Sequence, residues 1–232
     1  MTIGIVVALP EELSTLSPVK LARGEIVSSG SVFKLCLSGA GHANASQAAQ
    51  KLIEQGATKL ISWGCAAALA PHLKSGDLLI TSKIIANGES IENPSNWADQ
   101  ISGCLAIDPL MTGFALASNY GLISASAAKH HLFTETAAVA LDMESAAVAS
   151  IARDAKLPFV AVRAIADPAA MSLPPAILRA LSPEGDVVMG ILIKHILSHP
   201  WEIPALIKLG MHFSAAQKTL RVVSKQLEQF SE

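Results

Sequence analysis

Residues 137–156, AAVALDMESAAVASIARDAK, join an apolar run to a helical pattern within one short stretch. The run AAVALD (137–142) predicts a buried strand, and MESAAVASIARDAK (143–156) keeps its apolar residues on one face, which predicts a helix. Two acids, Asp142 and Glu144, fall at the junction. A buried strand that leads into a helix is typical of α/β proteins. The acids at its end are either a helix cap or part of a binding site.

The same alternation continues along most of the chain. Further strands are predicted at 2–9, 31–38, 59–64, 77–85, 120–125 and 157–167, and further helices at 42–56 and 108–119. Gly56 is a favourable C-cap for the first of these helices, and an Asp-Pro pair begins the second. Apolar strands interleaved with helices predict an α/β fold whose sheet is covered on both faces. Without an internal repeat or a low-complexity linker, a single domain is expected.

The C-terminal part has a different pattern. Two helical stretches, 186–200 and 201–230, are interrupted at Pro200 and Pro204. The second stretch spaces its apolar residues at near-helical intervals and has a basic side. The apolar residues are Leu206, Leu209, Phe213, Leu220, Val223 and Leu227, and the basic ones are Lys208, Lys218, Arg221 and Lys225. We therefore divide the chain into an α/β domain (1–199) and a helical extension packed on it (200–232). The extension either packs on the domain or a partner, or contacts lipid.

Composition narrows the classes of function. The chain of 232 residues is 51% hydrophobic and 16% charged with a net charge of −2, which predicts a large core and argues against a nucleic-acid partner. The three cysteines, Cys36, Cys65 and Cys104, have no metal-ligand spacing and fit a reducing cytoplasm. The start of the chain lacks a signal-peptide pattern, and no apolar run reaches the length of a membrane span.

Candidate site residues follow the predicted strands, where open α/β sheets bind their ligands. Glu11 and Glu12 follow the first strand, SGAGHANA (38–45) the second, WGCAAALAP (63–71) the third, and Asp167 the last. Each has a plain structural alternative: the glutamates suit a first helical turn, the glycines a tight connection, and Asp167 a turn before Pro168. No histidine or cysteine pair at these positions predicts a metal site.

The motifs taken together are more specific than any one of them. IGIVVALPEEL (3–13), SGAGHANA (38–45), WGCAAALAPHLKSGDLLI (63–80), LDMESAAVA (141–149) and PFVAVRAIAD (158–167) occur in this order. The chain thereby resembles the purine nucleoside phosphorylase / methylthioadenosine–adenosylhomocysteine nucleosidase superfamily. That resemblance implies a central, mixed, twisted β-sheet flanked by helices. The short spacer before LDMES and the C-terminal extension resemble the hopanoid-associated phosphorylase branch, which implies cleavage of adenine from a lipid-linked nucleoside of the adenosylhopane type.

The resemblance also implies roles for individual residues. Asp167 corresponds to the acid that protonates purine N7, Glu144 to the acid that holds the ribose hydroxyls, and Met143 to the residue packed against the sugar. Contacts to the base are expected from Ser124, Ala125 and Ser126. The family implies a homo-oligomer. No cofactor is expected, apart from inorganic phosphate as a possible co-substrate. The expected location is the cytoplasm, with peripheral contact of the C-terminal helix to the inner membrane surface as a further expectation.

The nucleophile stays open between water and inorganic phosphate. Glu12 falls where nucleosidases of the superfamily have the glutamate that activates water. An anion or nucleophile site is expected around Gly39, Gly41, His42, Gly64 and Cys65, where Cys65 replaces the serine of the phosphorylases. The arginines of the usual phosphate-binding set are incomplete, which favours hydrolysis. A soluble methylthioadenosine or adenosylhomocysteine nucleosidase, a purine nucleoside phosphorylase and a non-catalytic nucleoside-binding protein are the alternatives.

Overall fold

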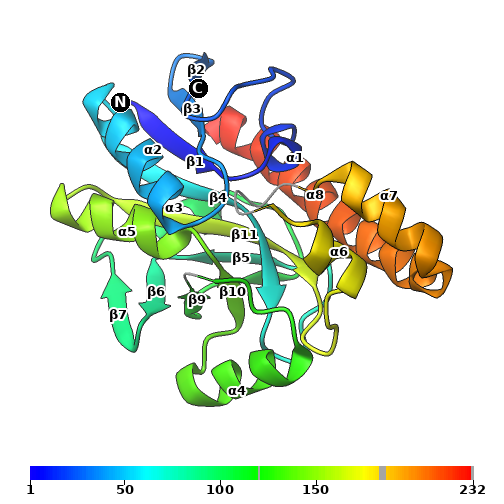
Figure 1. Ribbon diagram of the computed structural model, residues 1–232. Helices are drawn as coiled ribbons and strands as arrows, with labels where there is room; N and C mark the ends of the chain where they lie inside the picture. The colour runs from blue at the N-terminus through cyan, green and yellow to red at the C-terminus, as the bar shows by residue number, and fades with distance from the viewer. Residues whose placement is uncertain (120, 183–186, 231–232) are drawn as a thin grey trace.

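The computed structural model describes residues 1–119, 121–182 and 187–230, and in this part eleven strands form one mixed, twisted sheet flanked by helices (Figure 1). The predicted fold class is confirmed. The strands are β1 (Ile3–Val7), β2 (Ile26–Ser29), β3 (Phe33–Leu37), β4 (Lys59–Ala68), β5 (Leu78–Thr81), β6 (Lys83–Ala86), β7 (Glu89–Glu92), β8 (Leu110–Met111), β9 (Leu116–Ser118), β10 (Ala140–Asp142) and β11 (Phe159–Asp167). The helices are α1 (Pro10–Leu13), α2 (His42–Glu54), α3 (Trp97–Gly103), α4 (Ser126–Thr136), α5 (Ser145–Asp154), α6 (Pro175–Ala180), α7 (Met189–Ser198), the 3-10 helix η1 (Pro200–Glu202) and α8 (Ile203–Phe230).

Strand β4 is the centre of the sheet and decides where the strand ends meet. It pairs in parallel with β1, up to Val7 opposite Trp63, and with β11, up to Asp167 opposite Ala67. Its last residues pair antiparallel with β10, so that Leu141 lies opposite Ala67. The carboxyl ends of β1, β10 and β11 therefore converge on residues 63–67 of β4.

Helices cover both faces of the sheet. On one face, α2 and α5 pack small alanine side chains against β1, β4 and β11, which brings each helix close to the sheet. On the other face, α1, α3 and the second half of α8 cover the same strands. In α8, Leu220 and Val223 are fully buried and Leu227 is 5% exposed. Three of the six apolar residues predicted as one stripe in 201–230 thus belong to the core.

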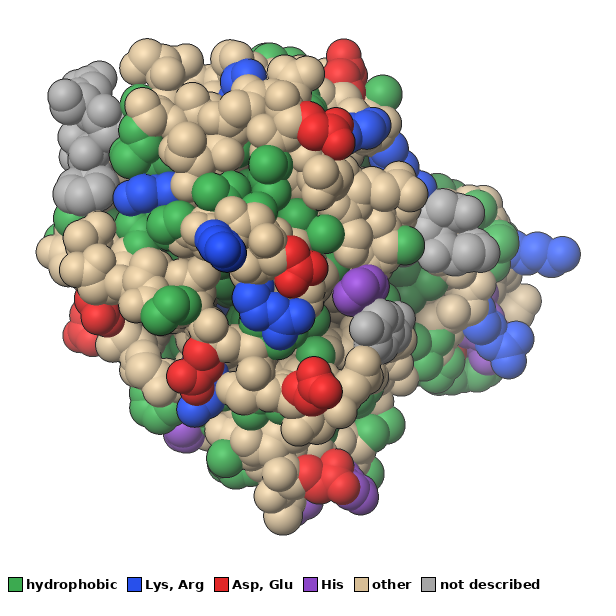
Figure 2. Space-filling model, turned by 90° about the vertical axis from the view of Figure 1, so that its left-hand side faces the viewer, with side chains coloured by type: hydrophobic (Ala, Val, Ile, Leu, Met, Phe, Trp, Pro, Cys, Tyr) green, Lys and Arg blue, Asp and Glu red, His purple; other side chains and the backbone are tan. Residues whose placement is uncertain are grey.

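The first half of α8 and the helix before it behave differently. Residues 187–211, called the apolar arm below, project beyond the edge of the sheet (Figure 1). Their exposed large apolar side chains are Val187, Val188, Met189, Ile191, Ile193, Leu197, Trp201, Ile203, Ile207 and Met211. No helix in the described part of the chain is both long and apolar enough to cross a membrane. On the face seen in Figure 2, acidic and basic side chains are scattered among uncharged ones.

The sequence patterns misplace the elements between residues 108 and 136. The helix predicted at 108–119 is wrong, because β8 and β9 occupy this stretch, with Gly113 at φ 75° between them. Pairing of β9 with β10 and β6 outweighs the local helix signal of Asp108 and Pro109. For the strand predicted at 120–125, no strand runs through 121–125, and Tyr120 lies outside the described residues. Asp186, the first residue of the predicted helix 186–200, also lies outside them.

Candidate active site

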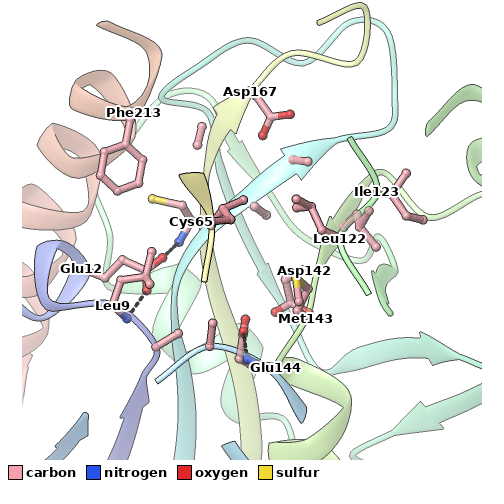
Figure 3. A pocket seen from close by; sticks show the side chains of 18 of the residues that line it. Leu9, Glu12, Cys65, Leu122, Ile123, Asp142, Met143, Glu144, Asp167 and Phe213 are labelled. Carbon is pink, nitrogen blue, oxygen red and sulfur yellow. Dashed lines mark hydrogen bonds between the residues drawn. The ribbon is translucent and has the colours of Figure 1, made fainter. Parts of the chain in front are cut away.

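A cavity of about 500 Å³ opens where the ends of β1, β10 and β11 meet β4 (Figure 3). Glu12, Glu144 and Asp167 line it from three sides, with Cys65 between them and Phe213 of α8 on one wall. The volume lies in the range of small-molecule sites, and the position is the usual ligand site of an open α/β sheet.

Glu12 is held by backbone donors from two strand ends. It lies in α1 directly after β1, and only 5% of it is exposed. Its Oε1 accepts from the N–H of Cys65 at 2.7 Å, and its Oε2 from the N–H of Leu9 at 3.2 Å. A Cβ on Gly64 would lie 2.5 Å from Oε1, so the glycine leaves room for the carboxyl group. Burial raises the pKa of Glu12, and Arg163 partly offsets this, so Glu12 is a stronger base than an exposed glutamate.

Glu144 faces the same cavity from the start of α5. Its Oε1 accepts from the N–H of Gly41 at 2.8 Å, in the turn that leads into α2. Burial and the nearby Asp142 raise the pKa of Glu144 to about 7, against an opposing effect of Arg163. A carboxylate at this point is able to accept hydrogen bonds from vicinal hydroxyl groups.

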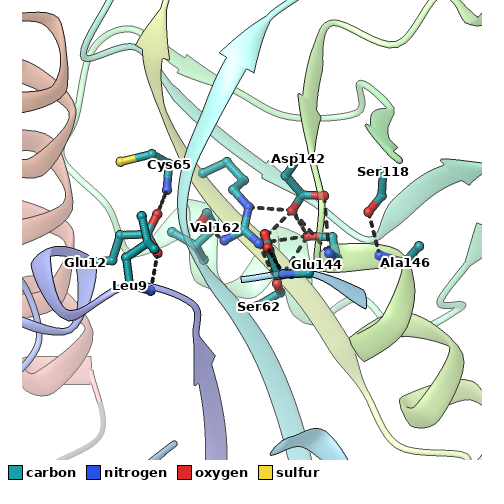
Figure 4. Close-up of polar contacts among 12 residues, drawn as sticks. Leu9, Glu12, Ser62, Cys65, Ser118, Asp142, Glu144, Ala146 and Val162 are labelled. Atoms are coloured by element: carbon teal, nitrogen blue, oxygen red, sulfur yellow. Dashed lines mark hydrogen bonds and ion pairs between the residues drawn. The ribbon is translucent and has the colours of Figure 1, made fainter. Parts of the chain in front are cut away.

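Asp142 lies near Glu144 (Figure 4) and is hydrogen-bonded to the buried Arg163. The Nε of Arg163 donates to Asp142 at 2.7 Å, and its Nη2 donates to Ser62 at 2.6 Å. Asp142 also accepts from the hydroxyl of Ser145 at 2.5 Å. Because Arg163 is only 2% exposed, it partly neutralises the acids without itself lining the cavity, whereas its partner Asp142 does line it.

Asp167 ends β11, and its carboxyl group contacts the Nζ of Lys129. Burial raises the pKa of Asp167, while Lys129 and, more weakly, His212 act in the opposite direction. Lys129 comes from α4 and is fully buried. Burial therefore favours the protonated form of Asp167, whereas the ion pair with Lys129 favours its carboxylate.

The cavity is acidic. Among the described residues that line it are Glu12, Asp142, Glu144 and Asp167, and that lining includes no lysine, arginine or histidine. The backbone donors of Gly41 and Cys65, which were expected to bind an anion, instead donate to carboxylates of the protein. Burial and Glu12 raise the pKa of Cys65 well above its usual value, so the group is a neutral thiol.

The structure brings together part of the set predicted from the sequence. The predicted residues that line the cavity are Glu12, Gly41, Cys65, Met143, Glu144 and Asp167. The predicted residues that are not among the lining residues are Gly39, His42, Gly64, Ser124, Ala125 and Ser126. In place of Ser124, Ala125 and Ser126, the preceding residues Leu122 and Ile123 line the cavity.

Other site residues have weak signals in the sequence. Phe213 is one apolar position among many in a long helix, and only the packing of α8 turns it towards the cavity. Lys129 lies in a polar stretch with two histidines that looks like surface. A single lysine between two alanines and two histidines gives no sign that it is buried, since lysine is almost never fully buried without a partner.

Comparisons with known proteins agree with this architecture. A sequence profile of the phosphorylase superfamily matches residues 2–116 and 115–176. The structure is similar to 5′-methylthioadenosine/S-adenosylhomocysteine nucleosidase from Neisseria meningitidis in complex with methylthio-immucillin-A, with a TM-score of 0.71 and 19% identity over 98% of this chain and 99% of that one. It is also similar to futalosine hydrolase of Helicobacter pylori strain 26695, with a TM-score of 0.69 and 19% identity over 98% and 95% of the two chains.

The match to the superfamily, the fold and the acidic cavity define an enzyme that cleaves N-glycosidic bonds. Because the profile covers well over half of the sequence, the chain belongs to the phosphorylase superfamily.

Proposed function

We propose that the protein hydrolyses the ribosyl N-glycosidic bond of an adenine nucleoside with a large apolar 5′ group, of the adenosylhopane type, and releases adenine. The observation that carries this proposal is the convergence of three acids on one cavity: Glu12 and Asp167, which are buried, and Glu144, which is partly buried. A protein that only binds nucleosides has no need for three acids with raised pKa values.

The charge of the cavity supports water rather than phosphate as the nucleophile. Phosphate is a dianion that proteins bind with arginine, lysine or unoccupied backbone donors. Here the described lining has acids and no basic side chain, and the N–H groups of Gly41 and Cys65 donate to Glu144 and Glu12. A dianion in this cavity would be repelled. Water, by contrast, can donate a proton to the buried Glu12.

Each acid then has one task in the proposed reaction. Asp167 gives its proton to purine N7 while the C1′–N9 bond breaks, and the electron pair of that bond passes to the purine. Glu144 accepts hydrogen bonds from the ribose hydroxyls, and its negative charge stabilises the positive charge that develops on the sugar. Glu12 takes a proton from the water that adds to C1′. The products are adenine and the free sugar.

The apolar arm supports a lipid-like 5′ group. Phe213 of α8 and Leu181, which follows α6, line the cavity, so the wall on this side is continuous with the C-terminal helices. The arm exposes ten large apolar side chains, including Trp201 at 71% and Leu197 at 79%. Its charged side chains are Lys194, Lys208 and Glu202, the last of which pairs with His195 at 2.9 Å.

A surface of this kind suits peripheral contact with an anionic membrane, from which a lipid-linked nucleoside can enter the cavity. The proposal accordingly includes a cytoplasmic enzyme at the inner membrane surface. We also propose a homo-oligomer, as the family resemblance implies.

A smaller 5′ group is the second candidate. The similarity to 5′-methylthioadenosine/S-adenosylhomocysteine nucleosidases favours it, because those proteins align with this chain over nearly its whole length. The two candidates share the same three acids and differ only in what lies beyond the 5′ carbon.

One product assay separates these possibilities. The purified protein is incubated with adenosine, 5′-methylthioadenosine and a 5′-alkyl adenosine of long chain, each with and without phosphate. Adenine, the free sugar of each substrate and its 1-phosphate are quantified. We expect adenine and free sugar without phosphate, and the highest kcat/KM for the long-chain substrate. Strict dependence on phosphate would contradict hydrolysis. A preference for 5′-methylthioadenosine would favour the second candidate.

A further inference from the structure

Lys129 is buried in a way that packing does not explain. Within α4, whose residues are all described, it is the one buried position of an otherwise half-buried to exposed helix, and its side chain is fully inaccessible. Its Nζ contacts the carboxyl group of Asp167 and also donates to the carbonyl oxygens of Met171 at 2.9 Å and Pro168 at 3.2 Å. All three donors of the ammonium group therefore have acceptors, and all three acceptors lie at or just beyond the end of β11.

Burying the charged side chain of Lys129 costs free energy, and a role in the active site would account for that cost. Removing an ammonium group from water is unfavourable, and pairs of buried charges are poor contributors to stability. An apolar side chain in the same place would fill the space at less cost. The ion pair instead holds Oδ2 of Asp167, a residue that lines the cavity.

We propose that Lys129 is a positioning residue that stabilises the carboxylate left on Asp167 after its proton has passed to the purine. The inference rests on the proposed function, since it assigns a partner to the acid of that reaction. When the proton moves from Asp167 to N7, the carboxyl group becomes an anion in a buried site. Because Lys129 already faces that anion, the surrounding groups need not rearrange when the charge forms.

Three groups face Asp167 from the elements packed around it. Lys129 faces it from α4, His212 from α8 and Cys65 from β4. Lys129 exerts the largest opposing effect on the raised pKa of Asp167, and His212 acts in the same direction less strongly. The neutral thiol of Cys65 adds no charge. Removing the charge of Lys129 should therefore raise the pKa of Asp167 further, make it a weaker acid, and keep it protonated to higher pH.

The test is the pH profile of kcat/KM, measured with the adenine nucleoside that the wild type cleaves fastest. In Lys129→Met, the alkaline limb should move up by about one to three pH units, the effect of one close opposite charge. The rate on the plateau should fall by about tenfold, since a weaker acid protonates N7 less readily. Lys129→Arg keeps the charge and should keep the limb within about half a unit of its wild-type position.

Several outcomes would overturn the inference. An unchanged limb in Lys129→Met, with activity lost equally at every pH, would mean that the lysine is merely structural. If this variant does not fold, Lys129→Gln provides the same comparison while retaining hydrogen bonds to the carbonyl groups. A displaced limb in Lys129→Arg would contradict it independently. Asp167→Asn separates failure of the proposed function from failure of the inference about Lys129. Full activity in Asp167→Asn refutes Asp167 as the acid. An inactive Asp167→Asn together with an unchanged limb in Lys129→Met refutes only the role of Lys129.

Discussion

Glu144→Gln tests the proposed contact with the ribose. The substitution keeps the shape of the side chain, and its carbonyl oxygen is still able to accept from the N–H of Gly41 at the 2.8 Å distance seen for Glu144. What it removes is the negative charge and one acceptor. Each hydrogen bond from a hydroxyl to a charged group contributes about 1.5–3 kcal/mol, so removing both ribose hydrogen bonds corresponds to roughly a 10²- to 10⁴-fold decrease in kcat/KM.

The assay compares adenosine with 2′-deoxyadenosine in both proteins. Wild type should prefer adenosine, because the deoxy substrate lacks one of the two hydroxyls. In Glu144→Gln the preference should shrink, since the partner of that hydroxyl has lost its charge. A variant with kcat/KM within about threefold of wild type, or with an unchanged preference, would refute the assignment of Glu144 to the sugar.

Stability supplies the control for this variant. Burial and Asp142 raise the pKa of Glu144 to about 7 from 4.5, so the folded state binds a proton more tightly than the unfolded state between these values. This residue's contribution to stability is therefore present below pH 4.5 and is lost as pH rises through about 7. Glu144→Gln should melt at a higher temperature than wild type above about pH 7. A loss of activity in a protein that melts later cannot result from unfolding.

Further substitutions test the rest of the account. Glu12→Gln should lower the rate of adenine release by about 10²- to 10⁴-fold with little change in KM, as measured by steady-state kinetics, because the base for water is removed; an unchanged rate would assign the water to another group. Gly64→Ala should displace the Glu12 carboxyl group, since the new Cβ would lie 2.5 Å from Oε1, and should lower kcat by at least about tenfold in the same assay, with a lower melting temperature; wild-type values for both would mean that the turn adapts. Leu197→Glu, at a side chain 79% exposed, should leave the melting temperature unchanged but reduce binding to anionic vesicles about tenfold in co-sedimentation; equal sedimentation of variant and wild type would contradict membrane contact by the arm. Trp201 is exposed whereas Trp63 and Trp97 are buried, so a blue shift of the tryptophan emission on vesicle addition reports Trp201 alone.

The strand ends were predictable because they depend on short-range patterns. Apolar runs such as 2–9 and 157–167 predict their strands, and the rule that parallel strands bind ligands at their carboxyl ends selects Glu12 and Asp167. The helix 42–56 is also close to α2, since its small apolar face and its terminal glycine agree with each other.

The parts that failed depend on packing between distant segments. The stretch 108–119 carries a helix signal, yet strand partners that are far away in sequence decide its structure. Lys129 and Asp167 are 38 residues apart, and nothing near Lys129 predicts that α4 turns it inward. In α8 the periodic pattern does not show that Leu220 belongs to the core while Leu206 and Leu209 of the same stripe are only half-buried. For this reason, deletion of 200–232 would remove core residues, and point substitutions in the arm are the sharper test.

The central claim is that Asp167 donates the proton on which cleavage depends. The direct measurement is the rate of adenine release by Asp167→Asn together with the dissociation constant of the same nucleoside by calorimetry. The account predicts a decrease of at least about 10²-fold in the rate, with a dissociation constant within a few-fold of wild type. Near-normal release of adenine by that variant would contradict it.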